Sequence, residues 1–188
     1  MINTTGLGPH RLDKARRPQW FFSREHTGGI LTDIASHQCE QFLFFTAAPE
    51  AEIVAATVAN QANPNTPELQ DFGEMLLRTR DATGYIRVDW FTPDGLPNWG
   101  DGRLTILGTE GYIELRKYVD PAGQAGTDHL LLVDRKGVHR VDCSAVELPY
   151  GGQLVQDILQ RTETAMPQAR CFKAMELALR AQALAEGS

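Results

Sequence analysis

The sequence lacks the features that mark membrane proteins and proteins that bind nucleic acids. No apolar run is long enough to cross a bilayer, and no charged start is followed by a cleavable apolar stretch. The formal net charge is −6 at pH 7, and no basic run is longer than the pair Arg16-Arg17. This charge argues against nucleic acid and anionic membrane as partners, so we expect a small molecule instead.

Cysteine is scarce, and a dinucleotide fingerprint is missing. The three cysteines, Cys39, Cys143 and Cys171, are odd in number and in no metal-binding spacing. They predict free thiols, no metal site and a reducing, cytoplasmic environment. No G-x-G-x-x-G follows a strand pattern, and the segment Gly6-Leu7-Gly8-Pro9-His10 lacks the third glycine of a phosphate loop and opens no helix. The sequence therefore predicts no dinucleotide-binding unit of its own.

What the chain does contain is a series of short alternating segments that predict a sheet. With 188 residues, 42% of them apolar, it can bury one core, and we expect a single domain over residues 1–188. Short turns join the predicted strands, and such turns link only antiparallel neighbours. The predicted strands cover residues 52–59, 69–80, 85–91, 103–107, 112–118, 129–133 and 138–142.

The ends of the chain are predicted to contain no strand. Residues 1–27 carry Gly6, Gly8, Pro18 and the pairs Arg16-Arg17 and Phe21-Phe22, and they predict a loop that leads into a helix. Residues 153–161 and 168–184 predict two packing helices. Their expected buried stripes are Leu154, Ile158 and Leu159 in the first, and Cys171, Phe172, Met175, Ala178 and Leu179 in the second. The fold class is thus α+β, with a large, mostly antiparallel open sheet and helices packed on one face.

The other face of that sheet is open to two interpretations. Arg87, Asp89, Glu114 and Arg116 alternate with apolar residues in the predicted strands, and aromatic residues are frequent among them. We expect this face to serve for association into a homo-oligomer. The alternative is a solvated surface of mixed charge with scattered aromatic side chains.

The most informative stretch is residues 28–45. Leu31, Ile34, Ala35, Gln38, Phe42 and Phe45 recur at helical spacing and predict the buried stripe of one amphipathic helix. The preceding pair Gly28-Gly29 allows the backbone to approach another group closely. Asp33 and His37 are four residues apart on another side of the helix, so one small substrate could touch both.

Two kinds of role are compatible with Asp33 and His37. An imidazole can carry a proton at neutral pH, and a carboxylate one turn away can orient it or bind a hydroxyl. The alternative is a solvated ion pair that contributes about 0.2–0.5 kcal/mol. A zinc site that adds Cys39 is disfavoured, because Cys39 lies on a different side of the helix and no fourth ligand is evident. Upstream, Trp20 and Arg17 either form a lid over a polar ligand, or Trp20 packs onto the helix.

Two motifs give the chain a family resemblance. Gly28-Gly29-Ile30-Leu31-Thr32-Asp33-Ile34-Ala35-Ser36-His37 resembles the glycine-pair helix of the Gfo/Idh/MocA family, the NAD(P)-dependent enzymes of the glucose-fructose oxidoreductase and inositol dehydrogenase type. Leu107-Gly108-Thr109-Glu110-Gly111-Tyr112-Ile113-Glu114-Leu115 is similar to the "GTEG" strand turn of that family. The resemblance covers essentially the whole chain and is to the family's C-terminal domain.

The resemblance implies roles for particular residues. His37 would transfer a proton or bind a substrate hydroxyl, and Asp33 would orient the substrate or tune that proton. Arg11, Arg17 and Trp20 would line the substrate pocket. NAD or NADP, and the lysine of a Glu-Lys-Pro motif, would come from an N-terminal Rossmann domain that this sequence lacks, so no cofactor is expected on this chain alone.

The function implied is that of a substrate-binding and oligomerisation domain. The complete oxidoreductase would act on a sugar, a cyclitol or a related polyhydroxylated compound. The chain departs from common family sequences at Ala35 and Glu40, which leaves the Asp33 and His37 pair intact. The alternative is a standalone binding or scaffold module without redox activity.

Overall fold

A computed structural model describes residues 1–96 and 98–187 of the chain. In chain order the elements are β1 (Ile2–Leu7), η1 (Pro9–Leu12), η2 (Gln19–Phe22), α1 (Arg24–Thr27), α2 (Ile30–Asp33), α3 (Ser36–Thr46), β2 (Glu52–Ala59), β3 (Phe72–Arg78), β4 (Thr83–Asp89), β5 (Gly100–Leu107), β6 (Gly111–Arg116), β7 (His129–Asp134), β8 (Gly137–Val141), α4 (Tyr150–Gln160) and α5 (Gln168–Glu186). Among these described residues, no helix has the length and apolar character needed to cross a membrane.

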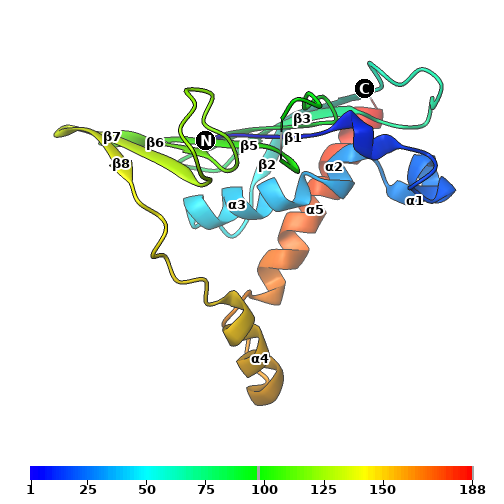
Figure 1. The fold of residues 1–188 in the computed structure, drawn as a ribbon. Helices are drawn as coiled ribbons and strands as arrows, with labels where there is room; N and C mark the ends of the chain where they lie inside the picture. The colour runs from blue at the N-terminus through cyan, green and yellow to red at the C-terminus, as the bar shows by residue number, and fades with distance from the viewer. Residues whose placement is uncertain (97, 188) are drawn as a thin grey trace.

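The strands form one open sheet in the order β2-β3-β4-β1-β5-β6-β7-β8. All neighbouring strands are antiparallel except β1 and β4, which run parallel. The helices α2, α3 and α5 lie on one side of this sheet (Figure 1). The prediction of an α+β fold with a large, mostly antiparallel sheet is therefore confirmed.

The prediction of a loop over residues 1–27 was wrong at its start. Ile2–Leu7 forms β1, which lies in the middle of the sheet between β4 and β5. Its pairing with β4 is the parallel one in this mostly antiparallel sheet. The strand was missed because its alternate residues Asn3 and Thr5 are polar, so the sequence shows no apolar alternation. Asn3 is nevertheless buried.

The single helix predicted over residues 28–45 is two helices. α2 ends at Asp33 and α3 begins at Ser36. Ile34 has a φ of −107°, and the N–H of His37 donates to the carbonyl of Ile34, only three residues back. The predicted stripe is buried except for Phe45, which is 48% exposed, because the break changes the phase of α3 and turns Cys39 and Leu43 toward the core instead.

Of the stripe predicted for the last helix, only Ala178 is buried, and the other four residues are exposed. Phe172 is 71% exposed and Leu179 51% exposed, whereas Ala174, Leu177, Ala178 and Ala181 are buried. α5 packs against β2 and α3, and its alanines allow that close approach. The stripe predicted in the preceding helix was also wrong, because Leu154, Ile158 and Leu159 of α4 are all exposed.

Glycines in the sheet set how closely the helices approach it. A Cβ atom at Gly84 of β4 would lie 2.6 Å from Cδ2 of Phe42 in α3, and one at Gly73 of β3 would lie 2.6 Å from Cγ2 of Ile30 in α2. Both separations are too short for carbon atoms in contact. The sheet therefore lacks side chains where α2 and α3 rest on it.

Replacing Gly84 with alanine should destabilise the fold by about 1–3 kcal/mol, because the new methyl group overpacks the buried Phe42 ring. Gly95→Ala is the matched control, since a Cβ there meets nothing within 4 Å. Urea unfolding of both variants measures the difference. Equal stability of the two variants would contradict the close approach of α3 to β4.

Candidate active site

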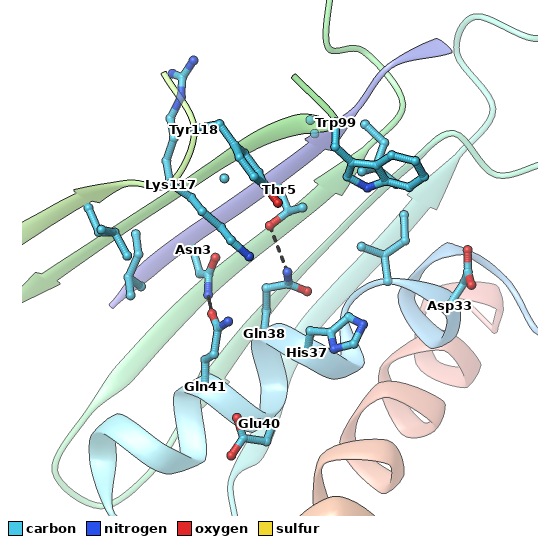
Figure 2. Close-up of a pocket in the computed structure, with 18 of the residues that line it drawn as sticks. Asn3, Thr5, Asp33, His37, Gln38, Glu40, Gln41, Trp99, Lys117 and Tyr118 are labelled. Carbon is cyan, nitrogen blue, oxygen red and sulfur yellow. Dashed lines mark hydrogen bonds between the residues drawn. The ribbon is translucent and has the colours of Figure 1, made fainter. Parts of the chain in front are cut away.

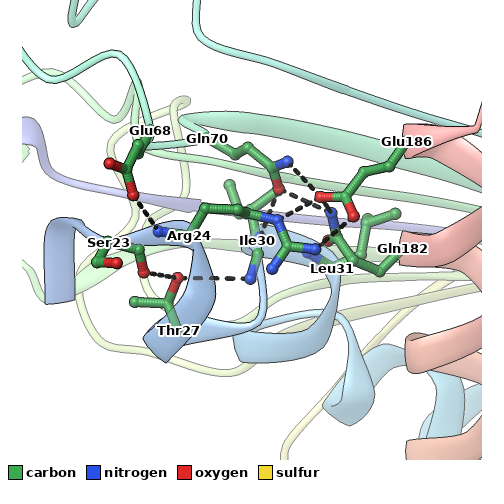
Figure 3. A network of polar contacts seen from close by, with 10 residues as sticks. Ser23, Arg24, Thr27, Ile30, Leu31, Glu68, Gln70, Gln182 and Glu186 are labelled. Carbon is green, nitrogen blue, oxygen red and sulfur yellow. Dashed lines mark hydrogen bonds and ion pairs between the residues drawn. The ribbon is translucent and has the colours of Figure 1, made fainter. Parts of the chain in front are cut away.

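The site begins with the anchoring of α2 at its N-terminus. The first N–H groups of a helix have no partner within it. Here Ile30 N–H donates to Oε1 of Gln70 (3.1 Å) and Leu31 N–H donates to Oε1 of Gln182 (3.0 Å). Nε2 of Gln182 donates in turn to Gln70 and to Glu186, at 2.9 Å each, and Glu186 also pairs with Arg24 (Figure 3). α5 thus holds the start of α2 in place.

The glycine pair makes this anchoring possible. Gly28 has a φ of 75° and ends α1, and Gly29 has a φ of 88° and precedes α2. A Cβ atom at Gly29 would lie 2.4 Å from the amide carbon of Gln182. The predicted close approach at these glycines is therefore present, and the group approached is a side chain of α5.

Asp33 and His37 lie on the wall of one cavity of about 850 Å³. Asp33 comes from the end of α2 and His37 from the first turn of α3 (Figure 2). Both residues are exposed, although neighbouring stripe residues on these helices are buried. The structure brings together the two residues that the sequence singled out, across a helix break rather than along one helix.

The rest of the cavity wall combines polar and aromatic side chains. β1 and α3 contribute amides and a hydroxyl that are already linked: Asn3 donates to Gln41 (2.6 Å), and Gln38 donates to Thr5 (2.9 Å). The aromatic side chains are Phe21, Phe44, Phe45, Trp90, Trp99 and Tyr118, and the charged ones besides Asp33 are Arg17, Glu40, Lys117 and Arg170. Figure 2 shows Lys117 and Trp99 directed into the space above α3.

Of the three further residues predicted to line the pocket, Arg17 does so. Its guanidinium stacks 4.2 Å from the centroid of the Phe21 ring. Arg11 lies outside the lining, but it stacks 3.5 Å from the centroid of the Trp99 ring and donates from Nε to the Trp99 carbonyl (3.0 Å), so it fixes a residue that does line the cavity. Trp20 lies outside the lining and is 54% exposed, and it contacts the lining residue Phe21 edge to face.

Sequence reasoning missed the contribution of β1 and of the segment around β5 and β6. Asn3, Thr5, Trp99 and Lys117 all line the cavity. No apolar alternation marked the first two, because Asn3, Thr4 and Thr5 are consecutive polar residues. No local pattern marks Trp99 or Lys117, because only the pairing of β5 with β1, and of β6 with β5, brings them near α3.

The electrostatics of Asp33 depend on its neighbours. Burial of the carboxyl group raises the pKa of Asp33 above its ordinary value, and the charges of Arg17 and His37 oppose that rise. The carboxylate thus faces two cationic or cation-forming side chains in a partly desolvated place. Such a group can accept hydrogen bonds from hydroxyls and can orient a neighbouring imidazole.

The zinc alternative receives no support from the geometry. Cys39 is fully buried, and its Sγ lies 3.7 Å from Sδ of Met75 in the core, away from the cavity that His37 faces. Burial raises the pKa of its thiol to about 12, whereas zinc needs the thiolate. Within residues 1–96 and 98–187 no three His, Cys, Asp or Glu side chains gather for a metal.

The pKa of Asp33 should exceed that of an unperturbed aspartate, and Arg17→Gln should raise it further because a nearby positive charge is lost. Arg16→Gln is the matched control, since the side chain of Arg16 is exposed and pairs with Asp13. Carbon-13 NMR titration of the Asp33 carboxyl group measures both effects. A pKa unchanged by Arg17→Gln would place Arg17 too far away to act on Asp33.

Comparison with known proteins adds three findings. Residues 2–114 match the family described as GFO/IDH/MocA C-terminal domain. No curated protein matches the chain. A protein from Erwinia carotovora atroseptica SCRI1043, assigned as an oxidoreductase, is 46% identical and has a TM-score of 0.91, and the match covers 98% of this chain and 54% of that one.

Two more distant structures share the fold. An oxidoreductase from Agrobacterium radiobacter, solved with NAD⁺, L-tartaric acid and magnesium, is 18% identical with a TM-score of 0.69, and the match covers 98% of this chain and 54% of that one. GenD2 from gentamicin A biosynthesis, solved with NAD, is 20% identical with a TM-score of 0.64, over 100% of this chain and 52% of that one. The chain thus spans about half the length of the structures it matches.

Proposed function

Because the chain belongs to the GFO/IDH/MocA C-terminal domain family, we propose that it is the substrate-binding half of an NAD(P)-dependent oxidoreductase. The proposed substrate is a sugar, a cyclitol or a related polyhydroxylated compound. The observation that carries this proposal is the shared cavity of Asp33 and His37. The bound molecules of two distant relatives agree with it: one holds NAD⁺ and L-tartaric acid, a hydroxylated acid, and the other holds NAD.

The cavity wall suits a polyol in two ways. The polar groups of Asn3, Gln38 and Gln41 lie on the side of β1 and α3 and can exchange hydrogen bonds with hydroxyls. The rings of Trp90, Trp99 and Tyr118 offer apolar faces to the C–H groups of the same molecule. A small number of placed polar groups among aromatic surfaces is typical of small-molecule sites.

In the proposed reaction His37 accepts the proton of the substrate hydroxyl, and Asp33 orients the substrate or the imidazole. A general base placed at the reacting hydroxyl accelerates such reactions about 10²–10⁴-fold. The nicotinamide would supply the hydride acceptor. The residues described here form no cradle for it, because the chain lacks a glycine-rich strand-to-helix turn. The dinucleotide is therefore assigned to a preceding Rossmann half.

We also propose association through the sheet face opposite the helices. Arg87 with Asp89 and Arg116 with Glu114 form ion pairs there at 3.0 Å each. These pairs leave few unmatched charges on that part of the face, and α2, α3 and α5 all pack on the other side of the sheet. A homo-oligomer formed through this face would leave the cavity accessible.

A chimera provides the test of activity. The part of the Erwinia protein that precedes the matched region is fused to this chain, and reduction of NAD⁺ or NADP⁺ is followed with a panel of polyols and sugar acids. The chimera should turn over at least one of them, and His37→Ala should reduce kcat/KM by about 10²–10⁴ because the proton acceptor is lost.

His139→Ala is the control, since His139 lies on β8, pairs with Asp134 and is outside the cavity lining. It should leave turnover unchanged. Full activity in His37→Ala would remove His37 from the mechanism. Polyol binding without any reduction of either dinucleotide would favour the binding module over the oxidoreductase.

A further inference from the structure

α4 exposes an apolar face that nothing described in this chain covers. Leu154, Val155, Ile158 and Leu159 are all exposed, with Leu159 at 71%, and Asp157 is the only buried residue of the helix. Leu148, in the segment that leads into α4, is 89% exposed. An isolated helix of this length is marginal in water, so an uncovered apolar face on it indicates a binding surface.

The turn after α4 is held by hydrogen bonds to one carboxylate of that helix. The carboxylate of Asp157 accepts hydrogen bonds from the hydroxyls of Thr162 and Thr164, at 2.7 Å each, and from the N–H groups of Thr164 and Ala165, at 2.8 Å each. These bonds hold the pKa of Asp157 far below its ordinary value. They hold the turn between α4 and α5, and α4 projects beyond the first turn of α5 (Figure 1).

We propose that the apolar face of α4 docks on the Rossmann half of the complete oxidoreductase, an inference that rests on the proposed function. Ala165 and Met166, in the connection after α4, and Arg170, in the first turn of α5, line the cavity of Asp33 and His37. The chain that leaves α4 therefore runs along the cavity wall, so a body that covers α4 can also border the cavity. The dinucleotide-binding half must reach that cavity to bring the nicotinamide to the substrate.

The match to the Erwinia protein supports this occupant. The match covers 98% of the present chain at a TM-score of 0.91. The unmatched 2% is much shorter than α4, so most of α4 and its connections belong to the matched region. That protein is nearly twice as long, so the same projecting helix exists there beside a further half of the chain. The face itself indicates the partner's chemistry: Asp157 is the only charged residue of α4, so the complementary surface is apolar and uncharged.

Amide hydrogen exchange of α4 tests the docking. In the chimera with the Erwinia half, α4 should exchange at least about tenfold more slowly than in this chain alone, because docking suppresses local opening. Ile158→Asp in the chimera should return exchange to the rate of the chain alone. Gln156→Asp, an exposed polar position of the same helix, should keep the protection. Exchange of the buried Leu177 region of α5 reports that each variant is folded.

Two results would overturn the docking. One is equal exchange of α4 in the chimera and in the chain alone. The other is slow exchange of α4 in the chain alone, together with a dimer in sedimentation that Ile158→Asp converts to a monomer. In that case a second copy of this chain would cover α4. If the chimera does not fold, the separate Erwinia half is added to this chain labelled with nitrogen-15, and the NMR signals of α4 are followed. Unchanged signals of α4 would contradict the docking. Protection without turnover would reject only the proposed function, and turnover without protection only the docking.

Discussion

The position of the candidate catalytic residues depends on two side-chain amides at the start of α2. Gln70 and Gln182 accept the N–H groups of Ile30 and Leu31, which have no partner within the helix. Glu186 and Arg24 extend the same network (Figure 3). Since α2 is only one turn long, this anchoring fixes the direction in which Asp33 leaves it. Gly29 leaves the space that the amide of Gln182 occupies, because a Cβ atom there would lie 2.4 Å from its amide carbon.

After α2 the helix is interrupted before α3 begins, so Asp33 and His37 lie on the cavity wall on either side of a helix break. The break at Ile34 and Ala35 lets both residues stay buried while α3 begins in a new phase. Phe42 then rests on Gly84 of the sheet, and His37 is left at the cavity wall. The strand below, β1, is polar where it faces α3, so the cavity acquires amides and a hydroxyl from Asn3 and Thr5.

The sequence predicted the fold class, the family and the residues around which the cavity forms. It could do so because the glycine pair, Asp33 and His37 are close in the chain, and because alternation marks β2 to β8 directly. It could not predict β1, whose polar residues face a cavity rather than a core. Nor could it place Trp99 and Lys117, which reach the site only through strand pairing.

The errors in α4 and α5 have a related physical cause. Apolar periodicity indicates that one face of a helix is buried. It does not indicate which other element or polypeptide covers that face. In α5 the face that packs on α3 and β2 consists largely of alanine, while the larger apolar residues, such as Phe172, point outward. In α4 the whole apolar face is exposed. Both helices therefore expose apolar side chains that packing among the described residues does not bury.

The most direct measurement is a crystal structure of the chimera with a polyol that it turns over. Substrate hydroxyls should lie within hydrogen-bond distance of the Asp33 carboxylate and of the His37 ring, in the cavity between β1 and α3. A polyol bound elsewhere, with Asp33 and His37 contacting only water, would contradict their assignment to the reaction.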